Sequence, residues 1–237
     1  MIDLLIVNHR TAAECVALLA TVPEGFRALV LENGSGSNDR EALAGAPCEL
    51  DVSEENLGFA RGVNRLARRA RAEWLLLLNP DVVPAPGVLA GLAARLPPAP
   101  IAILGGERTG PGPRAHGRFP GLLDRFRRVD ATAAGPVDWV SGCFMLLRRA
   151  VFEELGGFDE GYFMQLEDVD LCWRARRRGH LAAVDPALTF AHRGHLSYAR
   201  AERSLARDYR AGKARFLERT GRPVAAAVLR AAHSLFD

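Results

Sequence analysis

The chain has 237 residues, of which 49% are hydrophobic and 25% are charged. This length suffices for one or two domains with a sizeable core, and the composition excludes collagen-like, low-complexity and wholly disordered chains. The formal net charge of +3 is too small to indicate a nucleic-acid partner. We therefore expect a globular protein that binds no nucleic acid.

The cysteines and the N-terminus indicate a cytoplasmic protein. Cys15, Cys48, Cys143 and Cys172 are widely spaced without a CxxC pair, which favours reduced, buried thiols over a zinc site or disulfides. The first ten residues lack the basic start of a signal peptide. No apolar run approaches the roughly 18 residues that a membrane span requires.

Short apolar runs closed by polar residues predict buried strands in the first half of the chain. These runs lie at residues 4–7, 28–31, 49–52 and 74–78. Helical patterns lie between them, one after Thr11, which is expected to cap its helix, and one over residues 58–72. Alternating strands and helices predict an α/β fold with a mostly parallel sheet flanked by helices.

The second half is less regular. Residues 105–136, rich in Gly, Pro and Arg, predict long loops, and residues 137–147 predict a strand. Helices are predicted over residues 150–155, over 166–178 before Gly179, and from Pro223 onward.

Polar residues follow three of the predicted strands, at Asn8, at Glu32 and from Asn79 to Asp81. Ligands of parallel α/β sheets bind beyond the carboxyl ends of the strands, so these residues are expected at one site. The carboxylate of Asp81 suits a hard divalent cation, although an Asn-Pro-Asp sequence is also typical of an ordinary turn.

Two further segments have the residues of a binding site. In residues 54–64, Gly58 permits close backbone approach beside the amides of Asn56 and Asn64, near a helix start that favours an anion. A capped helix would explain the same pattern. In residues 167–170, three carboxylates fall near a helix start within an apolar segment, which favours a cleft over a solvated helix end.

Seven segments together resemble the family 2 glycosyltransferases of the GT-A fold, and most closely the rhamnosyltransferase-like subset. They read LLIVNHR, LENGSGSND, ENLGFARGVN, LLLLNPDV, WVSGCFMLLRR, GGFDEGYFMQLEDVDLCWR and HRGHLS. The resemblance runs from Leu4 to about Ser197. It implies a Rossmann-like GT-A domain that transfers rhamnose or another hexose, with inversion, from a nucleoside-diphosphate sugar to an acceptor hydroxyl.

The resemblance also implies roles for individual residues. Asp168 would be the general base with Glu167 beside it, and Asp81 and His192 would lie at a Mg²⁺ or Mn²⁺ ion. The dTDP- or UDP-linked donor would be bound by Asn8, Glu32, Asn56, Gly58, Arg61, Asn64, Asn79, Trp139 and Gly142. Glu32 stands where relatives usually carry Asp, and Asn79 replaces the first Asp of the metal motif. The acceptor would be a glycan, a lipid-linked sugar or a small molecule.

The residue types suit this chemistry. A leaving diphosphate needs charge stabilisation from a metal and helix N-termini, and the acceptor hydroxyl needs a carboxylate base. Two other functions stay open. A non-catalytic nucleotide-sugar-binding module is disfavoured by the carboxylates of Asp81, Glu167 and Asp168 together. A nucleotidyltransferase is disfavoured by the missing Gly-rich basic loop in residues 4–11.

The C-terminal segment is basic. Between Arg193 and Arg230, ten lysines and arginines stand against three acidic residues, a net charge of +7 that leaves −4 for the rest of the chain. We predict a GT-A domain over residues 1–198 and a helical extension over residues 199–237. Basic and apolar side chains alternate there at helical spacing: Arg200, Arg203, Leu205, Arg207, Tyr209, Arg210, Lys213, Arg215, Phe216, Leu217 and Arg219. Such a helix could lie on an anionic membrane or dock on the domain by its apolar stripe.

Overall fold

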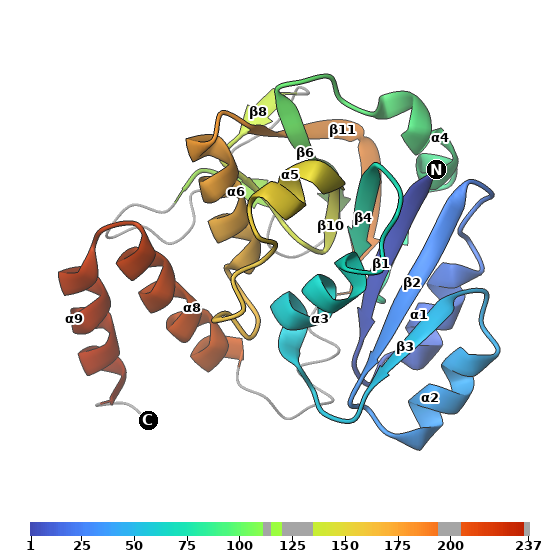
Figure 1. Ribbon diagram of the computed structural model, residues 1–237, viewed down its shortest axis with the longest axis horizontal. Helices are drawn as coiled ribbons and strands as arrows, with labels where there is room; N and C mark the ends of the chain where they lie inside the picture. The colour runs from blue at the N-terminus through green and yellow to red at the C-terminus, as the bar shows by residue number, and fades with distance from the viewer. Residues whose placement is uncertain (111–114, 120–134, 194–204, 235–237) are drawn as a thin grey trace.

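A computed structural model describes residues 1–110, 115–119, 135–193 and 205–234 (Figure 1). Within these residues a central sheet has the strand order β3-β2-β1-β4-β10-β6-β11-β5, and β8 pairs with β11. The strands are β1 (Ile2–Asn8), β2 (Phe26–Asn33), β3 (Glu49–Ser53), β4 (Trp74–Leu78), β5 (Val82–Pro84), β6 (Ile101–Thr109), β8 (Gly135–Val137), β10 (Phe144–Arg148) and β11 (Leu181–His192). A separate ribbon pairs β7 (His116–Gly117) with β9 (Trp139–Val140).

The sheet is mostly parallel, as predicted. Strands β3, β2, β1 and β4 run parallel to one another, and β11 runs parallel to β6. Strand β10 is antiparallel to both β4 and β6, and β5 and β8 are antiparallel to β11. The carboxyl ends of β1, β2 and β4 therefore meet at one edge of the sheet, which confirms the predicted convergence of polar strand ends.

Helices cover both faces of the sheet (Figure 1). They are α1 (Ala12–Leu19), α2 (Ser37–Ala44), α3 (Gly58–Ala67), α4 (Val88–Gly91) with the 3₁₀ turn η1 (Leu92–Arg95), α5 (Arg149–Glu154), α6 (Glu167–Arg177), α8 (Leu205–Arg219) and α9 (Pro223–Ser234). Leu4 and Ile6 of β1 pack into one core with α1, α2 and α4, and Leu5 packs into the other with α3, α5 and α6. Burial on both faces explains the continuous apolar runs of these strands.

Two helix predictions need correction. Thr11 occupies the N-cap position of α1, but its hydroxyl donates to Asn8 Oδ1 at 2.9 Å and makes no capping bond. The helix predicted over residues 58–72 ends at Ala67. The buried carboxylate of Asp3 accepts hydrogen bonds from the backbone N–H groups of Arg71 and Ala72, which holds these residues outside the helix.

The second half contains more strand than was predicted. Strand β6 extends to Thr109, into the segment that was predicted to be loop. Strand β11 was not predicted, because Pro186 interrupts its pattern and its register with β6 shifts between Asp185 and Thr189. The single strand predicted over residues 137–147 is interrupted by a turn over residues 141–143.

Several other predictions agree with the structure. Helix α6 lies within one residue of its predicted ends, α9 begins at Pro223 as expected, and all four cysteines are free thiols. No helix among the described residues is long and apolar enough to cross a bilayer. The predicted domain boundary at residues 198 and 199, together with Arg200 and Arg203, lies outside the described residues.

Candidate active site

The ends of β1 and β2 form a buried polar cluster. The Asn8 amide donates to Asp39 Oδ2 at 2.9 Å and accepts from the Thr11 hydroxyl, so both of its polar atoms are used within the protein. Glu32 is fully buried, and its Oε1 accepts from the backbone N–H of Ser35. Its Oε2 is buried without a hydrogen-bond partner. Such an acceptor costs about 1–3 kcal/mol, so it is a natural place for a donor group of a ligand.

Asn33, which no sequence pattern indicated, joins β2 to the loop before α3. Its Nδ2 donates to Asn56 Oδ1 at 3.0 Å, and its Oδ1 accepts from the backbone N–H of Leu57 at 2.9 Å. Asn56 Oδ1 also accepts from the N–H of Gly58, where α3 begins. The N–H of Phe59 donates to the carbonyl of Phe163, which ties the start of α3 to the segment before α6.

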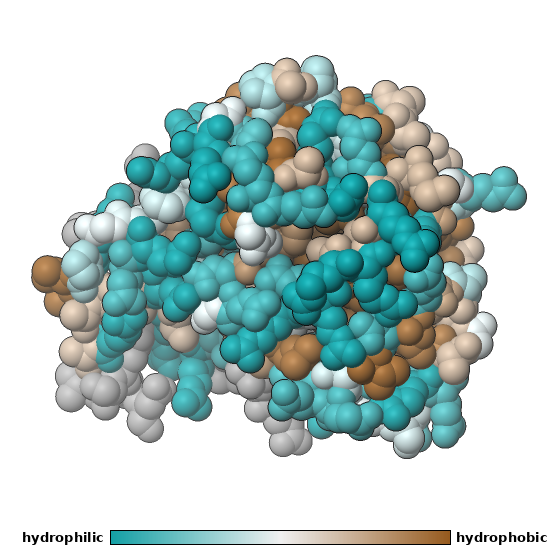
Figure 2. Space-filling view, viewed as in Figure 1, coloured by the Kyte–Doolittle hydropathy of each residue, from teal (hydrophilic) through white to brown (hydrophobic). Residues whose placement is uncertain are grey.

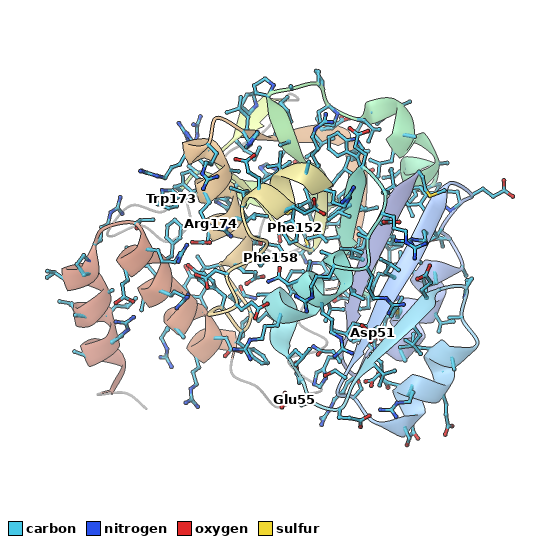
Figure 3. All side chains as sticks on the ribbon, viewed as in Figure 1. Asp51, Glu55, Phe152, Phe158, Trp173 and Arg174 are labelled. Atoms are coloured by element: carbon cyan, nitrogen blue, oxygen red, sulfur yellow. The ribbon has the colours of Figure 1, made fainter. Side chains whose placement is uncertain are left out.

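Asn64 and Arg61 lie on α3, and both contact the carboxylate of Glu160. Asn64 Nδ2 donates to the carbonyl of Phe158 and to Glu160 Oε1, and its Oδ1 accepts from the N–H of Phe158. Phe158 packs edge-on against Phe152 of α5, with ring centroids 5.4 Å apart (Figure 3). Asn64 therefore holds the loop after α5, while Arg61 is exposed and its Nε lies 3.8 Å from Glu160 Oε2.

Asp81 and His192 come together at the end of the sheet. Asp81 follows β4 in a tight turn in which the N–H of Val82 donates to the carbonyl of Asn79. Asp81 is buried, and its Oδ1 lies 3.1 Å from His192 Nε2. Burial favours the neutral ring of His192, but hydrogen bonds to Asp81 and Cys143 outweigh it and raise the pKa of His192 to about 9.

Glu167 and Asp168 open α6 immediately after a strained turn. Gln165 and Leu166 have φ values of 78° and 74°, left-handed conformations that cost on the order of 1–3 kcal/mol each for residues other than glycine. Asp168 Oδ2 accepts from the N–H of Gly142 at 2.9 Å, and its Oδ1 accepts from the N–H of Val169. A strained backbone that aims a carboxylate is typical of a functional site.

Burial controls the protonation of these two carboxyls. It raises the pKa of Asp168, against the opposing effect of hydrogen bonds from Gly142, Val169 and Ser141. Burial, together with the neighbouring charge of Asp168, raises the pKa of Glu167 well above its ordinary value. Glu167 Oε2 is buried and has no hydrogen-bond partner. The two neighbours therefore favour a state in which one of them carries a proton.

The turn over residues 141–143 connects the segment that carries Asp81 with the carboxylate of Asp168. The carbonyl of Cys143 accepts from the N–H of Asn79, beside Asp81, and the N–H of Gly142 donates to Asp168. A Cβ at position 142 would lie 2.9 Å from the Phe59 ring, so glycine permits this close approach. The interruption of the predicted strand thus links the segment of the expected metal ligand and the expected base through one turn.

Trp139 lies just before this turn and is buried, and its Nε1 donates to the carbonyl of Arg118 at 3.1 Å. Ser141 and Cys143 were missed as site residues. Their only sequence signal is the small, polar Ser-Gly-Cys break between two apolar runs. The position of Trp139 and Gly142 at a donor sugar or acceptor stays a prediction.

The family follows from the sequence. Residues 40–211 match the sequence model described as glycosyltransferase-like family 2. The chain belongs to this family, and the GT-A fold predicted from the resemblance is confirmed.

Several known proteins are similar to the chain. The N-acetylglucosaminyl-diphospho-decaprenol L-rhamnosyltransferase of Mycobacterium tuberculosis is 31% identical over 201 residues, which cover 69% of this chain and 65% of that protein. Rhamnosyltransferase WbbL of Escherichia coli K12 is 43% identical over 65 residues, 26% of this chain and 25% of that protein. The chain thus spans less than two thirds of the length of these relatives.

A solved structure has the same fold across the whole chain. The mannosyltransferase PcManGT from Pyrobaculum calidifontis, in complex with GDP-Man and Mn²⁺, superposes with a TM-score of 0.62 at 16% identity. The match covers 99% of this chain and 75% of that one. GalNAc-T7 with UDP, GalNAc and Mn²⁺ gives a TM-score of 0.66 at 14% identity, over 81% of this chain and 43% of that one.

Proposed function

We propose that the chain transfers a hexose, with L-rhamnose as the first candidate, from a dTDP- or UDP-linked sugar to an acceptor hydroxyl with inversion. The observation that carries this proposal is the turn over residues 141–143, which joins the position of Asp81 to that of Asp168. The similarity to the rhamnosyltransferase of Mycobacterium tuberculosis supports the choice of sugar.

The nucleotide would bind at the ends of β1 and β2. The buried Oε2 of Glu32 needs a donor, and the imide N–H of uracil or thymine supplies one. A UDP- or dTDP-linked sugar therefore suits this acceptor. Asn8 would support this site from behind, because its amide is already bonded to Asp39 and Thr11.

A divalent cation would be held by Asp81 and His192. No cluster of three or more His, Cys, Asp or Glu side chains that could hold a metal occurs in the described parts of the chain. Asp81 and His192 would nevertheless hold one cation between them, since carboxylates suit Mg²⁺ and Mn²⁺. When bound, the cation would neutralise charge on the leaving diphosphate.

Asp168 would take the proton of the acceptor hydroxyl. As the acceptor oxygen bonds to the anomeric carbon, the bond from that carbon to the diphosphate oxygen breaks, and the diphosphate leaves with the electron pair. The N–H of Gly142 donates to Asp168 Oδ2, and the N–H of Val169 donates to Asp168 Oδ1, so both oxygens of the carboxylate are oriented by backbone hydrogen bonds. Proton transfer to a positioned carboxylate contributes roughly 10²–10⁴-fold.

A donor panel tests the proposal. Thermal shift with Mn²⁺ should select dTDP-rhamnose or a UDP-sugar, and the selected donor should then support transfer to a short-chain lipid diphosphate that carries N-acetylglucosamine. Transfer should stop on chelation. A protein that binds the donor but neither transfers nor hydrolyses it, with any cation, would instead be the non-catalytic binding module.

The acceptor is proposed to be lipid-linked and reached at the inner face of the membrane through α9. Val224 and Val228 of this helix are 76% and 64% exposed. Figure 2 shows an apolar spot at the left edge of the molecule, where α9 lies in Figure 1. The net charge of +7 between Arg193 and Arg230 includes Arg215 and Arg219, which pair with Asp159 and Asp170, so the proposed contact rests on the apolar face of α9. We therefore propose α9, and not α8, for the membrane contact, because Arg215 and Arg219 of α8 bond to Asp159 and Asp170.

Flotation with anionic vesicles tests the membrane contact. Replacing Val224 and Val228 by Glu should abolish flotation, because it removes the apolar face and adds negative charge. The matched control replaces Ala42 and Ala44, exposed residues of α2, by Glu. Equal flotation of the two variants would end the proposal of a membrane contact through α9.

A further inference from the structure

Helix α8 contacts the segment that leads into Glu167 and Asp168. Arg215 Nη2 donates to Asp159 Oδ1 at 2.7 Å, and its Nε donates to the other oxygen at 3.1 Å. Arg219 Nη1 lies 3.1 Å from Asp159 Oδ2. Burial would raise the pKa of Asp159, but hydrogen bonds from Arg215 and Gly161 outweigh it and lower that pKa. Two arginines of α8 thus hold the loop before α6 at a partly buried carboxylate.

A second link reaches the first turn of α6 itself. Asp170 has no exposed surface, and its two oxygens accept from Arg174 Nε at 2.7 Å and from Arg219 Nε at 2.9 Å. Arg174 also donates to the carbonyls of Leu155 and Gly157. Because Asp170 lies two residues after Asp168, Arg219 fixes the turn of helix that carries the proposed base.

The strained turn is the third point of contact. A Cβ at Gly212 of α8 would lie only 2.5 Å from the carbonyl oxygen of Gln165, so the glycine lets the helix press against this turn. Phe216, one turn further along α8, packs edge-on against Trp173 with ring centroids 6.5 Å apart. Trp173 projects from α6 toward α8 (Figure 3). Helix α8 therefore holds the left-handed conformation of Gln165 and Leu166 from outside.

We propose that Arg215 and Arg219 are positioning residues for proton transfer, and that with Gly212 they form a clamp on the strained turn that aims Asp168. The inference rests on the proposed function, because it assumes that Asp168 accepts the proton. It assigns a role to part of the basic C-terminal segment: these two arginines face the acidic residues of the domain, so they are not available to a membrane surface.

The test uses the full chain with Arg215→Gln, Arg219→Gln and the double substitution. Arg222→Gln is the matched control, because Arg222 is exposed at the end of the α8 region and makes no side-chain contact to the clamp among the described residues. Two readouts are needed: kcat and the donor KM in steady-state transfer, and hydrogen exchange of peptides covering residues 156–170.

We expect kcat to fall between about 10- and 100-fold in the double variant, since misplacement of a reacting group by about 1 Å has an effect of this size. The donor KM should stay within about twofold, because the nucleotide site lies on β1 and β2. Exchange in residues 156–170 should rise while exchange in β1 and β4 stays the same. Arg219→Lys should recover only part of kcat, because a lysine cannot reach Asp159 and Asp170 in the planar geometry of arginine.

Wild-type turnover and wild-type exchange in the double variant would overturn the clamp. A parallel loss of kcat, donor binding and exchange protection throughout the chain would also overturn it, since α8 would then be needed only for folding. If the wild-type chain transfers no sugar, the proposed function fails, and the exchange of residues 156–170 still decides whether Arg215 and Arg219 hold this segment.

Discussion

Asp81 and His192 are 111 residues apart in the chain, and Asp81 Oδ1 lies 3.1 Å from His192 Nε2. The register of the short strand β5 on β11 produces this contact, because His192 at the end of β11 pairs with Val82 at the start of β5. The N–H of Arg193 also donates to the carbonyl of Asp81. Backbone bonds thus fix both side chains at the edge of the sheet where the polar ends of β1 and β2 also lie.

Asp168→Asn should reduce transfer by roughly 10²–10⁴-fold, because the amide cannot accept the acceptor proton while it can still accept the N–H of Gly142. Donor binding, measured by calorimetry, should stay close to the wild type. Near-wild-type turnover by this variant would remove Asp168 from the mechanism.

Asp81→Asn should weaken Mn²⁺-dependent donor binding by about 10- to 100-fold, the range typical for disturbed metal sites. Binding measured in the presence of a chelator should be the same in both proteins. Asp185→Asn is a suitable control, because Asp185 pairs with Arg95 on the surface and not with the site. Equal Mn²⁺ stimulation in the Asp81 variant and the wild type would show that Asp81 holds no cation.

Glu167→Gln should stabilise the protein at pH 8. The pKa of Glu167 is raised in the folded chain above its ordinary value of 4.5, so the folded state binds the proton more tightly than the unfolded state. Wild-type stability therefore falls as the pH rises from 4.5 through the raised pKa, and each tenfold difference in proton affinity between the two states corresponds to about 1.4 kcal/mol.

Urea unfolding of both proteins between pH 4 and pH 8 measures this effect. The advantage of Glu167→Gln should shrink as the pH falls to 4, because below 4.5 the wild-type carboxyl is mostly protonated in both states. A variant that is no more stable than the wild type at pH 8 would show that burial does not raise the pKa of this carboxyl.

Asn64→Ala should lower the free energy of unfolding by about 1–3 kcal/mol, because it leaves the buried N–H and carbonyl of Phe158 without their partners. Thermal unfolding measures the loss, and Asn38→Ala, at an exposed position of α2, is the control. Unchanged stability with weakened donor binding would instead place Asn64 at the nucleotide, as the family resemblance implied.

Short apolar runs in the sequence predicted the strands of the first half of the chain. The apolar runs that became β1 and β4 are buried on both faces, and the polar residues after them lie at one edge of the sheet. Strand β11 could not be predicted, because its pairing with β6 includes a register shift around Pro186. Such pairing depends on contacts between distant parts of the chain.

The same distinction holds for the site. Motif spacing indicated Asp81, Asp168 and His192, and the structure brings Asp81 and His192 into contact. Motif spacing could not indicate that Asn64 bonds the Phe158 backbone or that Arg219 bonds Asp170, since those partners lie 94 and 49 residues away in the chain. Residue types predict the chemistry of this site, whereas tertiary packing decides which polar groups remain for a ligand.

The anomeric configuration of the product tests the central claim most directly. The wild-type chain would be supplied with dTDP-rhamnose, Mn²⁺ and the lipid diphosphate that carries N-acetylglucosamine, and the new glycosidic bond would be followed by proton NMR. We predict a product with the configuration opposite to that of the donor, formed at a rate that falls sharply in Asp168→Asn. A product that retains the donor configuration would contradict a single displacement assisted by Asp168.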